Sequence, residues 1–233
     1  METRRYFPQA RIARIDSDTT NEKDSLEILL DRFERREIDI LVGTQMIAKG
    51  LDFPNVLLVG IMAADSLLRL PDFRGAERNF ALLAQVAGRS GRGVKPGEVI
   101  LQTYYPEHHS IRFSLSEDYS GFYGEELGHR RAAGFPPYLF LAALTISTPS
   151  EEKTAALAAS CRQAFQGNPL IDQKNILGPS PAPIARIKGQ FRYQILVKHP
   201  DRKELSEIIA DALSRWRSSG SRFSIDLDPY FAL

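Results

Sequence analysis

The sequence contains a single cysteine, Cys161, and this scarcity excludes two kinds of stabilising site. One thiol cannot form an intramolecular disulfide or build a cysteine-rich zinc site, and such a composition suits a reducing cytoplasm. Cys161 lies within a helical apolar pattern and is expected to be buried. His108, His109 and His129 have no cysteine or acidic partner at zinc-ligand spacing, so we expect no metal site.

Long apolar runs and an excess of charge of one sign are absent too. No uninterrupted apolar segment approaches a membrane span, and no apolar run follows residues 1–5 as it would in an export signal. The formal net charge is +1, so any nucleic-acid partner has to be inferred from local patches. We expect a cytoplasmic globular protein with no membrane partner.

Two elements of ATP hydrolysis are missing. The sequence has no Gly-x-x-x-x-Gly-Lys-Ser/Thr loop to cradle phosphates and no acidic block after a strand to hold Mg²⁺. We therefore predict that the isolated chain does not hydrolyse ATP.

The first half of the chain alternates strands and helices. The apolar runs at residues 38–42 and 56–61 are nearly continuous, which is typical of parallel strands covered on both faces. Further strands are predicted at 10–15 and 98–104, and helices at 22–36 and 74–88. This order predicts an open α/β sheet, in which ligands bind at the carboxyl ends of the strands.

The most informative motif is Gln-x-x-Gly-Arg-x-Gly-Arg at residues 85–92. Gln85, Arg89 and Arg92 stand at i, i+4 and i+7 and share one face of a helix. Gly88 favours a helix end, where the backbone can approach a ligand. Forked arginines bind phosphate and stabilise charge during phosphoryl transfer. The alternative is a solvated helix end whose arginines complement the helix dipole.

A second motif occupies residues 43–53, directly after a predicted strand. It supplies a hydroxyl, an amide, a lysine, two glycines and a carboxylate, which are groups that bind phosphate and ribose. A strand-end turn at Gly43 with a helix cap at Gly50 would explain the same residues structurally. The position of the motif about forty residues before 85–92 makes the binding interpretation more specific.

Together the two motifs resemble motifs V and VI of superfamily 2 helicases, so that residues 10–105 look like a second RecA-like lobe. More narrowly, the chain resembles the PriA-type primosomal replication-restart DNA helicases. The finer resemblance is carried by residues 43–50, 72–78 leading into 85–89, 97–103 and 130–138.

The resemblance implies roles for individual residues. These are arginine fingers at Arg89 and Arg92; nucleotide contacts at Gln85, Gly88, Gly50 and Asp52; and coupling to DNA at Thr44, Gln45 and Lys49, where Lys49 could also contact phosphate or solvent. ATP and Mg²⁺ would bind only together with a first lobe that this chain lacks. The family also carries a zinc segment, for which this chain has no site, so the chain is expected to be a C-terminal part.

The second half has a different pattern. Residues 108–136 are expected to form a helical linker between a lobe at 1–107 and a C-terminal domain at 137–233. The domain reads β-α-β-β-α-β, which is the order of the ferredoxin-like α+β arrangement. Its third element, residues 176–187, contains three prolines and is expected at a sheet edge or to be irregular.

A hairpin in this domain carries Arg186, Lys188 and Arg192, together with Tyr193, and no acidic residue. Basic side chains interleaved with aromatic ones suit single-stranded or forked DNA, with cations on phosphates and a ring on a base. The alternative is that the rings pack inward and the charges protect an edge strand.

Three functions agree with these features. The first is the C-terminal half of an ATP-dependent DNA helicase that restarts replication at stalled forks, with single-stranded DNA-binding protein and primosome proteins as partners implied by the resemblance. The second is a non-catalytic module that binds DNA and docks to the primosome. The third is another superfamily 2 translocase, of the RecG or RNA-helicase type.

Overall fold

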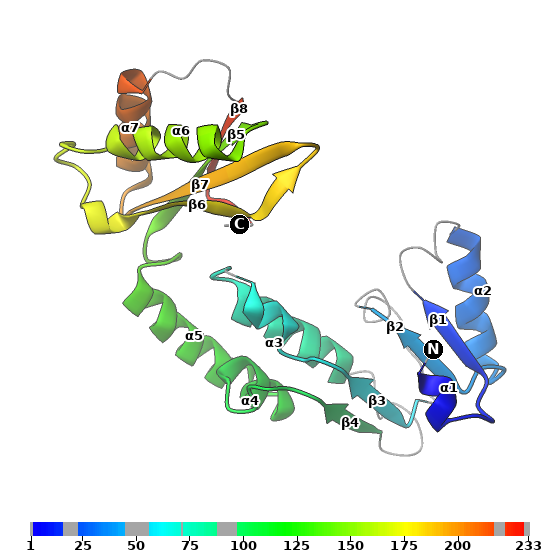
Figure 1. Ribbon diagram of the computed structural model, residues 1–233. Coiled ribbons are helices and arrows are strands. Elements are labelled where there is room, and N and C mark those ends of the chain that lie inside the picture. The colour runs from blue at the N-terminus through cyan, green and yellow to red at the C-terminus, as the bar shows by residue number, and fades with distance from the viewer. Residues whose placement is uncertain are drawn as a thin grey trace. The chain divides into compact units, whose positions relative to one another are not determined.

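The computed structural model describes residues 2–15, 23–44, 56–70, 72–87, 97–216 and 222–230, with the backbone alone at 23–25. It divides into two compact units (Figure 1). Unit 1 comprises Met1–Ser66 and Glu77–Tyr119, and unit 2 comprises Leu67–Ala76 and Ser120–Leu233. No helix among the described residues is long and apolar enough to cross a membrane.

Unit 1 contains the strand and helix alternation predicted for the first half. Its elements are α1 (Thr3–Tyr6), β1 (Ile12–Ile15), α2 (Lys23–Glu34), β2 (Ile40–Gly43), β3 (Leu58–Ile61), most of α3 (Gly75–Ala87), β4 (Glu98–Leu101) and α4 (His109–Leu115). The described strands form two parallel pairs, β1 with β2 and β3 with β4, instead of the single open sheet that was predicted. Parallel pairing itself is confirmed.

The starts of β1 and β2 are joined by a bidentate ion pair. Arg11 donates from Nε and Nη2 to Asp39 over 2.9 and 2.6 Å, and its backbone N–H donates to the same carboxylate over 2.8 Å. These bonds lower the pKa of Asp39 from its ordinary value. Because each residue directly precedes its strand, the pair supports the register in which Ile12 lies beside Ile40.

The two faces of the β3–β4 pair differ in exposure. Leu58 and Ile100 are 57% and 53% exposed, so the described residues leave their side of the pair largely uncovered. The continuous apolar pattern had predicted cover on both faces. In the described part of the chain that prediction holds for one face only, where Val59 and Val99 are half-buried.

Unit 2 is built around an antiparallel sheet with the strand order β6-β7-β5-β8. Its elements are η1 (Ser66–Arg69, all but its first residue), α5 (Tyr119–Ala133, all but its first residue), β5 (Phe140–Thr148), α6 (Glu151–Gln163), η2 (Gln173–Asn175), β6 (Ile176–Ile187), β7 (Gln190–His199), α7 (Arg202–Arg215) and β8 (Arg222–Leu227). From β5 onward this is the β-α-β-β-α-β order predicted for a ferredoxin-like domain, and the proline-rich β6 lies at an edge as expected.

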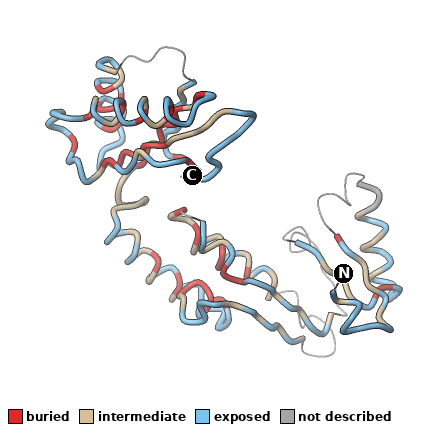
Figure 2. The backbone as a smooth tube through the Cα atoms, viewed as in Figure 1, coloured by how far each residue is buried: buried red, intermediate tan, exposed pale blue. Residues whose placement is uncertain are grey.

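Alternation along the central strands decides which face carries the core. Leu144 and Ile146 of β5 and Ile195 of β7 are fully buried in one apolar cluster with Cys161 of α6 and Ile208 of α7. Residues between them in sequence project to the other face because side chains alternate along a strand. Both helices therefore cover the same face of the sheet, and buried positions concentrate in the two central strands (Figures 1 and 2).

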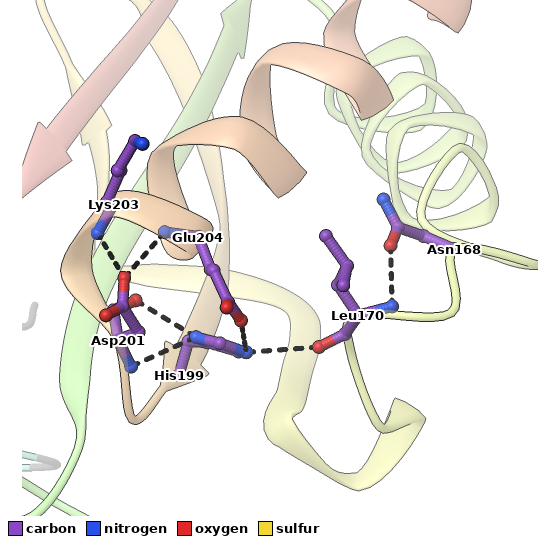
Figure 3. A network of polar contacts seen from close by, with 6 residues as sticks. All are labelled: Asn168, Leu170, His199, Asp201, Lys203 and Glu204. Atoms are coloured by element: carbon purple, nitrogen blue, oxygen red, sulfur yellow. Dashed lines mark hydrogen bonds and ion pairs between the residues drawn. The ribbon is translucent and has the colours of Figure 1, made fainter.

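The junction from β7 to α7 is fixed by a polar network (Figure 3). The Asp201 carboxylate accepts the Lys203 and Glu204 backbone N–H groups over 2.8 and 2.9 Å and caps α7. Next to it the His199 ring, 6% exposed, has Nδ1 at 3.1 Å from the Asp201 amide nitrogen and Nε2 at 3.1 Å from the Leu170 carbonyl. The buried imidazole is thus bonded at both nitrogens.

Candidate nucleic-acid interface

Two of the predicted helicase-motif residues lie within the described part of unit 1. Thr44 directly follows β2 and is exposed, and Gln85 is exposed in the last turn of α3. The remaining ones, Gln45, Lys49, Gly50, Asp52, Gly88, Arg89 and Arg92, lie outside the described residues, so their roles stay predictions.

Helix α3 has one buried face and one exposed face. Phe80 and Leu83 are 7% and 1% exposed, whereas Gln85 is exposed. A buried polar pair also holds the helix: Asn79 donates from Nδ2 to the Ser110 hydroxyl at the start of α4, over 3.1 Å. Gln85 is therefore presented to solvent by a helix whose opposite side is packed within unit 1.

In unit 2, β6 and β7 are joined by a two-residue turn at Lys188 and Gly189. Both residues have positive φ, 48° and 78°, which is the backbone of a type I′ hairpin turn. The right-handed twist of the strands favours this turn, and a glycine at the second position adopts it without strain. Lys188 is thereby held exposed at the tip of the hairpin.

The strand register separates the residues that were predicted to bind DNA together. Tyr193 pairs with Ile146 and packs, partly buried, against the core under the helices. Arg186 pairs with Phe191, and its guanidinium carbon lies 4.9 Å from the centre of that ring. Arg192 follows Phe191 in sequence and therefore projects from the opposite face of the sheet. A nucleic-acid strand on the Arg192 side would not reach the ring of Tyr193.

The charges of the hairpin are not neutralised locally. Within the described residues, Arg186, Lys188 and Arg192 form no ion pair; Arg192 donates one hydrogen bond, from Nη1 to the Ile184 carbonyl over 3.3 Å. Lys198 at the far end of β7 differs, since it is 6% exposed and donates to the Ala133 carbonyl over 2.9 Å. Burial lowers the pKa of Lys198. Three cations of the hairpin thus remain available to an anionic ligand.

A further cluster of cations and rings was not predicted from the sequence. Lys198 lies 4.7 Å from the centre of the Phe135 ring, and Phe135 stacks on Phe73. Two guanidinium groups, of Arg74 and Arg130, lie 5.2 and 5.1 Å from the Phe73 ring. Arg74 also lies 4.9 Å from the Tyr230 ring and donates to the Tyr230 carbonyl over 2.8 Å. We call these six residues the cation–aromatic cluster.

This cluster holds together residues far apart in the sequence. The segment Leu67–Ala76 contributes Phe73 and Arg74 to a unit otherwise formed by Ser120–Leu233. Only the high proportion of aromatic and basic residues at 72–78 and 130–138 could have suggested the contact. Cation–π and stacking interactions of this kind each contribute about 0.5–1.5 kcal/mol.

Comparison with known proteins finds one family for each half of the chain. Residues 1–94 match the family described as helicase conserved C-terminal domain, and residues 131–230 match the family described as primosomal protein N C-terminal domain. The chain therefore carries a RecA-like helicase lobe followed by a primosomal C-terminal domain.

Related proteins narrow this class. The chain is 46% identical over 236 residues to the replication restart protein PriA of Bacillus subtilis, which covers 100% of the chain and 29% of the relative. It is 48% identical over 198 residues to the protein of that name from Synechocystis, covering 83% of the chain and 23% of the relative. A third PriA, from Chlamydia muridarum, is 39% identical over 225 residues, or 96% of the chain and 30% of the relative.

The chain belongs to the family of PriA replication restart proteins and matches the C-terminal part of its members. It spans less than a third of the length of these relatives. The match to the primosomal C-terminal domain argues against the RecG or RNA-helicase alternative.

Proposed function

We propose that this chain supplies two activities to a replication-restart helicase: the arginine fingers of an ATP site and a DNA-binding surface. The observation that carries the proposal is the identity of 46% over the whole chain to a PriA protein, which includes both the 85–92 motif and the hairpin domain. ATP would supply the phosphoryl group. ATP and Mg²⁺ would be held mainly by the first lobe of the complete helicase, which this chain lacks.

In this proposal the residues near the end of α3 act on the nucleotide. Arg89 and Arg92 stabilise negative charge that develops on the transferred phosphoryl group, because a guanidinium is permanently charged and forked. Gln85 contacts the nucleotide, with Gly88, Gly50 and Asp52 beside it. Thr44, Gln45 and Lys49 couple this site to bound DNA. Gln85 and Thr44 are both exposed, as contact with a ligand requires.

The test of the ATP site uses a full-length PriA protein that contains this chain. Arg89→Ala and Arg92→Ala should each lower DNA-stimulated ATP turnover by about 10³-fold or more, the usual contribution of an arginine finger. Binding of a fluorescent ATP analogue should remain within severalfold. Arg5→Ala, in the exposed α1, is the control and should leave turnover unchanged.

The ATPase measurement can contradict the proposal. If both finger variants hydrolyse ATP at the wild-type rate, the assignment of residues 85–92 is wrong. The isolated chain is expected to show no ATP hydrolysis, and turnover abolished by Arg89→Ala in that preparation would contradict this expectation.

The DNA-binding part of the proposal rests on the hairpin cations. Replacing Arg186, Lys188 and Arg192 together by glutamine should weaken binding to a forked duplex and flatten its salt dependence, because each phosphate contact releases counterions. Lys153→Gln, on the exposed surface of α6, is the control for the effect of net charge. Unchanged affinity of the triple variant would remove the hairpin from the interface. Single-stranded DNA-binding protein and primosome proteins are the expected partners of the complete helicase.

A non-catalytic role in DNA binding and primosome docking is the second candidate, and for the chain by itself it is favoured by the missing phosphate loop. The two candidates separate in the ATPase experiment, because a docking module would tolerate Arg89→Ala in the full-length protein.

A further inference from the structure

The register of the antiparallel sheet places two arginines on either side of one serine. Ser147 of β5 pairs with Arg192 of β7 and with Arg222 of β8. Directly opposed residues of antiparallel strands project from the same face. Since Ile146 points into the core beneath α6 and α7, these three residues project from the opposite face, which we call the distal face. We call the three residues the arginine row.

The next row on the distal face is polar and uncharged. Thr145 pairs with Gln194 and Ser224, and Gln194 pairs in turn with Ser180 of β6. Among the residues of β5 to β8, the first carboxylate on this face is Asp226, four positions along β8 from Arg222. At about 3.3 Å per residue this separation is about 13 Å. Thr145 and Gln194 are buried, whereas Ser224 and Ser180 are exposed. The exposed groups of the row that borders the arginines are therefore uncharged hydroxyls.

Exposure increases toward the arginine row. Arg222 and Ser224 are exposed, and Arg192 and Ser147 are half-buried. At the other end of the same face the Lys198 ammonium lies over Phe135 and is buried. Within the described residues Arg222 forms no ion pair. Among the described residues of this face, only those at the end with the arginine row thus offer solvent-accessible, uncompensated positive charge.

We propose that the arginine row binds the phosphodiester backbone of single-stranded nucleic acid. This inference rests on the proposed DNA-binding function and adds to it a site on β8 that the hairpin does not contain. Neighbouring strands lie about 4.8 Å apart, so the two arginine backbones are separated by about 10 Å with a hydroxyl between them. Long forked side chains at that separation can bind one phosphate or two successive ones, and the serine can donate a hydrogen bond.

The chemistry of the face also indicates how the strand is read. None of the residues of β5 to β8 that project from the distal face is aromatic, because Phe191 and Tyr193 lie on the helix-covered side. Near the arginine row, bases consequently find no ring of these strands to stack on, and contacts there are limited to phosphates, which carry no sequence information. Lys188 at the turn extends the positive charge beyond Arg192 along β7. A flexible, sequence-independent polyanion is the ligand that fits.

The decisive variant is Arg222→Gln, because Arg222 lies outside the hairpin. Binding of a fluorescein-labelled oligothymidine to the full chain is measured by anisotropy at several salt concentrations. Arg222→Gln and Arg192→Gln should each reduce the slope of log K against log salt by about 0.7, the value for one phosphate contact on a single strand. Ser147→Asp, which places a carboxylate between the arginines, should weaken binding more than Ser147→Asn.

Two controls separate binding from folding and from net charge. Thermal unfolding of Arg222→Gln should match the wild type, since Arg222 is exposed. Lys153→Gln on α6 changes the charge by the same amount on the helix-covered side and should leave the slope unchanged.

The outcomes distinguish this inference from the function on which it rests. If Arg222→Gln binds like the wild type while Arg186→Gln and Lys188→Gln weaken binding, the arginine row is refuted and the hairpin stands. If the wild type shows no salt-dependent binding of oligothymidine, the arginine row is refuted as a single-strand site, whereas the hairpin is still decided by its binding to the forked duplex. An acidic peptide that binds the row without competition from oligothymidine would also overturn the proposal.

Discussion

The ring of Phe73 stacks on the ring of Phe135, with centroids 5.2 Å apart and planes within 5° of parallel. Phe73 belongs to the segment that matches the helicase C-terminal domain, and Phe135 to the segment that matches the primosomal C-terminal domain. Phe73 also lies two residues before the start of α3, the helix that leads into residues 85–92. The cation–aromatic cluster therefore holds the segment that directly precedes this helix against the rest of unit 2.

The first prediction concerns this stack. Phe73→Leu and Phe135→Leu should each destabilise the chain, and a double-mutant cycle should show a coupling free energy of about 1 kcal/mol, as for other aromatic pairs. Urea unfolding followed by near-ultraviolet circular dichroism measures the effect. The control is Phe223→Leu, because the Phe223 ring packs on Trp216 and not on Phe73. Its effect on the unfolding free energy should add to that of Phe73→Leu. A coupling free energy of zero between Phe73 and Phe135 would show that the stack adds nothing to stability.

The second prediction follows from the buried ammonium of Lys198. Desolvation lowers its pKa in the folded chain, so the folded state releases this proton at a lower pH than the unfolded state. In that window the unfolded state binds more protons, and the stability contributed by Lys198 rises with pH up to the ordinary lysine pKa of about 10.4. The unfolding free energy of the wild type relative to that of Lys198→Met should therefore rise as the pH increases toward about 10.4.

Lys153→Met is the control for Lys198→Met, because Lys153 is exposed. The difference in unfolding free energy between Lys153→Met and the wild type should be the same at every alkaline pH. A flat difference for Lys198→Met as well would mean that the ammonium is solvated in the folded state.

The third prediction concerns the cap of α7. Backbone N–H groups, that of Glu204 first, lower the pKa of Asp201 by bonding its carboxylate. A depressed carboxyl pKa stabilises the fold above the unfolded value of about 3.9, and this contribution is lost as pH falls through the folded value. Asp201→Asn keeps a hydrogen-bond acceptor but has no carboxyl group to titrate, so the melting temperatures of the two proteins should converge as the pH falls below about 3.9. Asp201→Ala should be less stable than both at neutral pH. A difference in melting temperature between wild type and Asp201→Asn that stays constant with pH would refute this prediction.

The fourth prediction uses the single thiol. Cys161 is fully buried, and burial raises its pKa to about 12. Because the thiolate is the reactive form, a disulfide reagent at pH 8 should label the native chain only at the rate at which the core opens. Ala159→Cys introduces an exposed thiol on the same helix, and this thiol should be labelled at once. Cys161 should be labelled rapidly only after denaturant is added. Rapid labelling of Cys161 in the native wild type would contradict the closed core.

The sequence by itself determined the elements and the family. Periodicity located α2 and α3 and the β-α-β-β-α-β order, because side chains alternate in strands and repeat every 3.6 residues in helices whatever the rest of the chain does. The spacing within residues 85–92 and 43–53 was sufficient to indicate a helicase-like chain, which the comparisons confirmed at the level of the family.

Only the tertiary structure decided which side chains share a surface. Arg192 and Tyr193 are neighbours in sequence but project from opposite faces, and Arg222 becomes a neighbour of Arg192 only through pairing with Ser147. The stack of Phe73 on Phe135 likewise joins segments that are far apart in the sequence, and no local pattern predicts that they meet. Register and long-range packing depend on the whole sheet and its core, and a local sequence pattern does not contain that information.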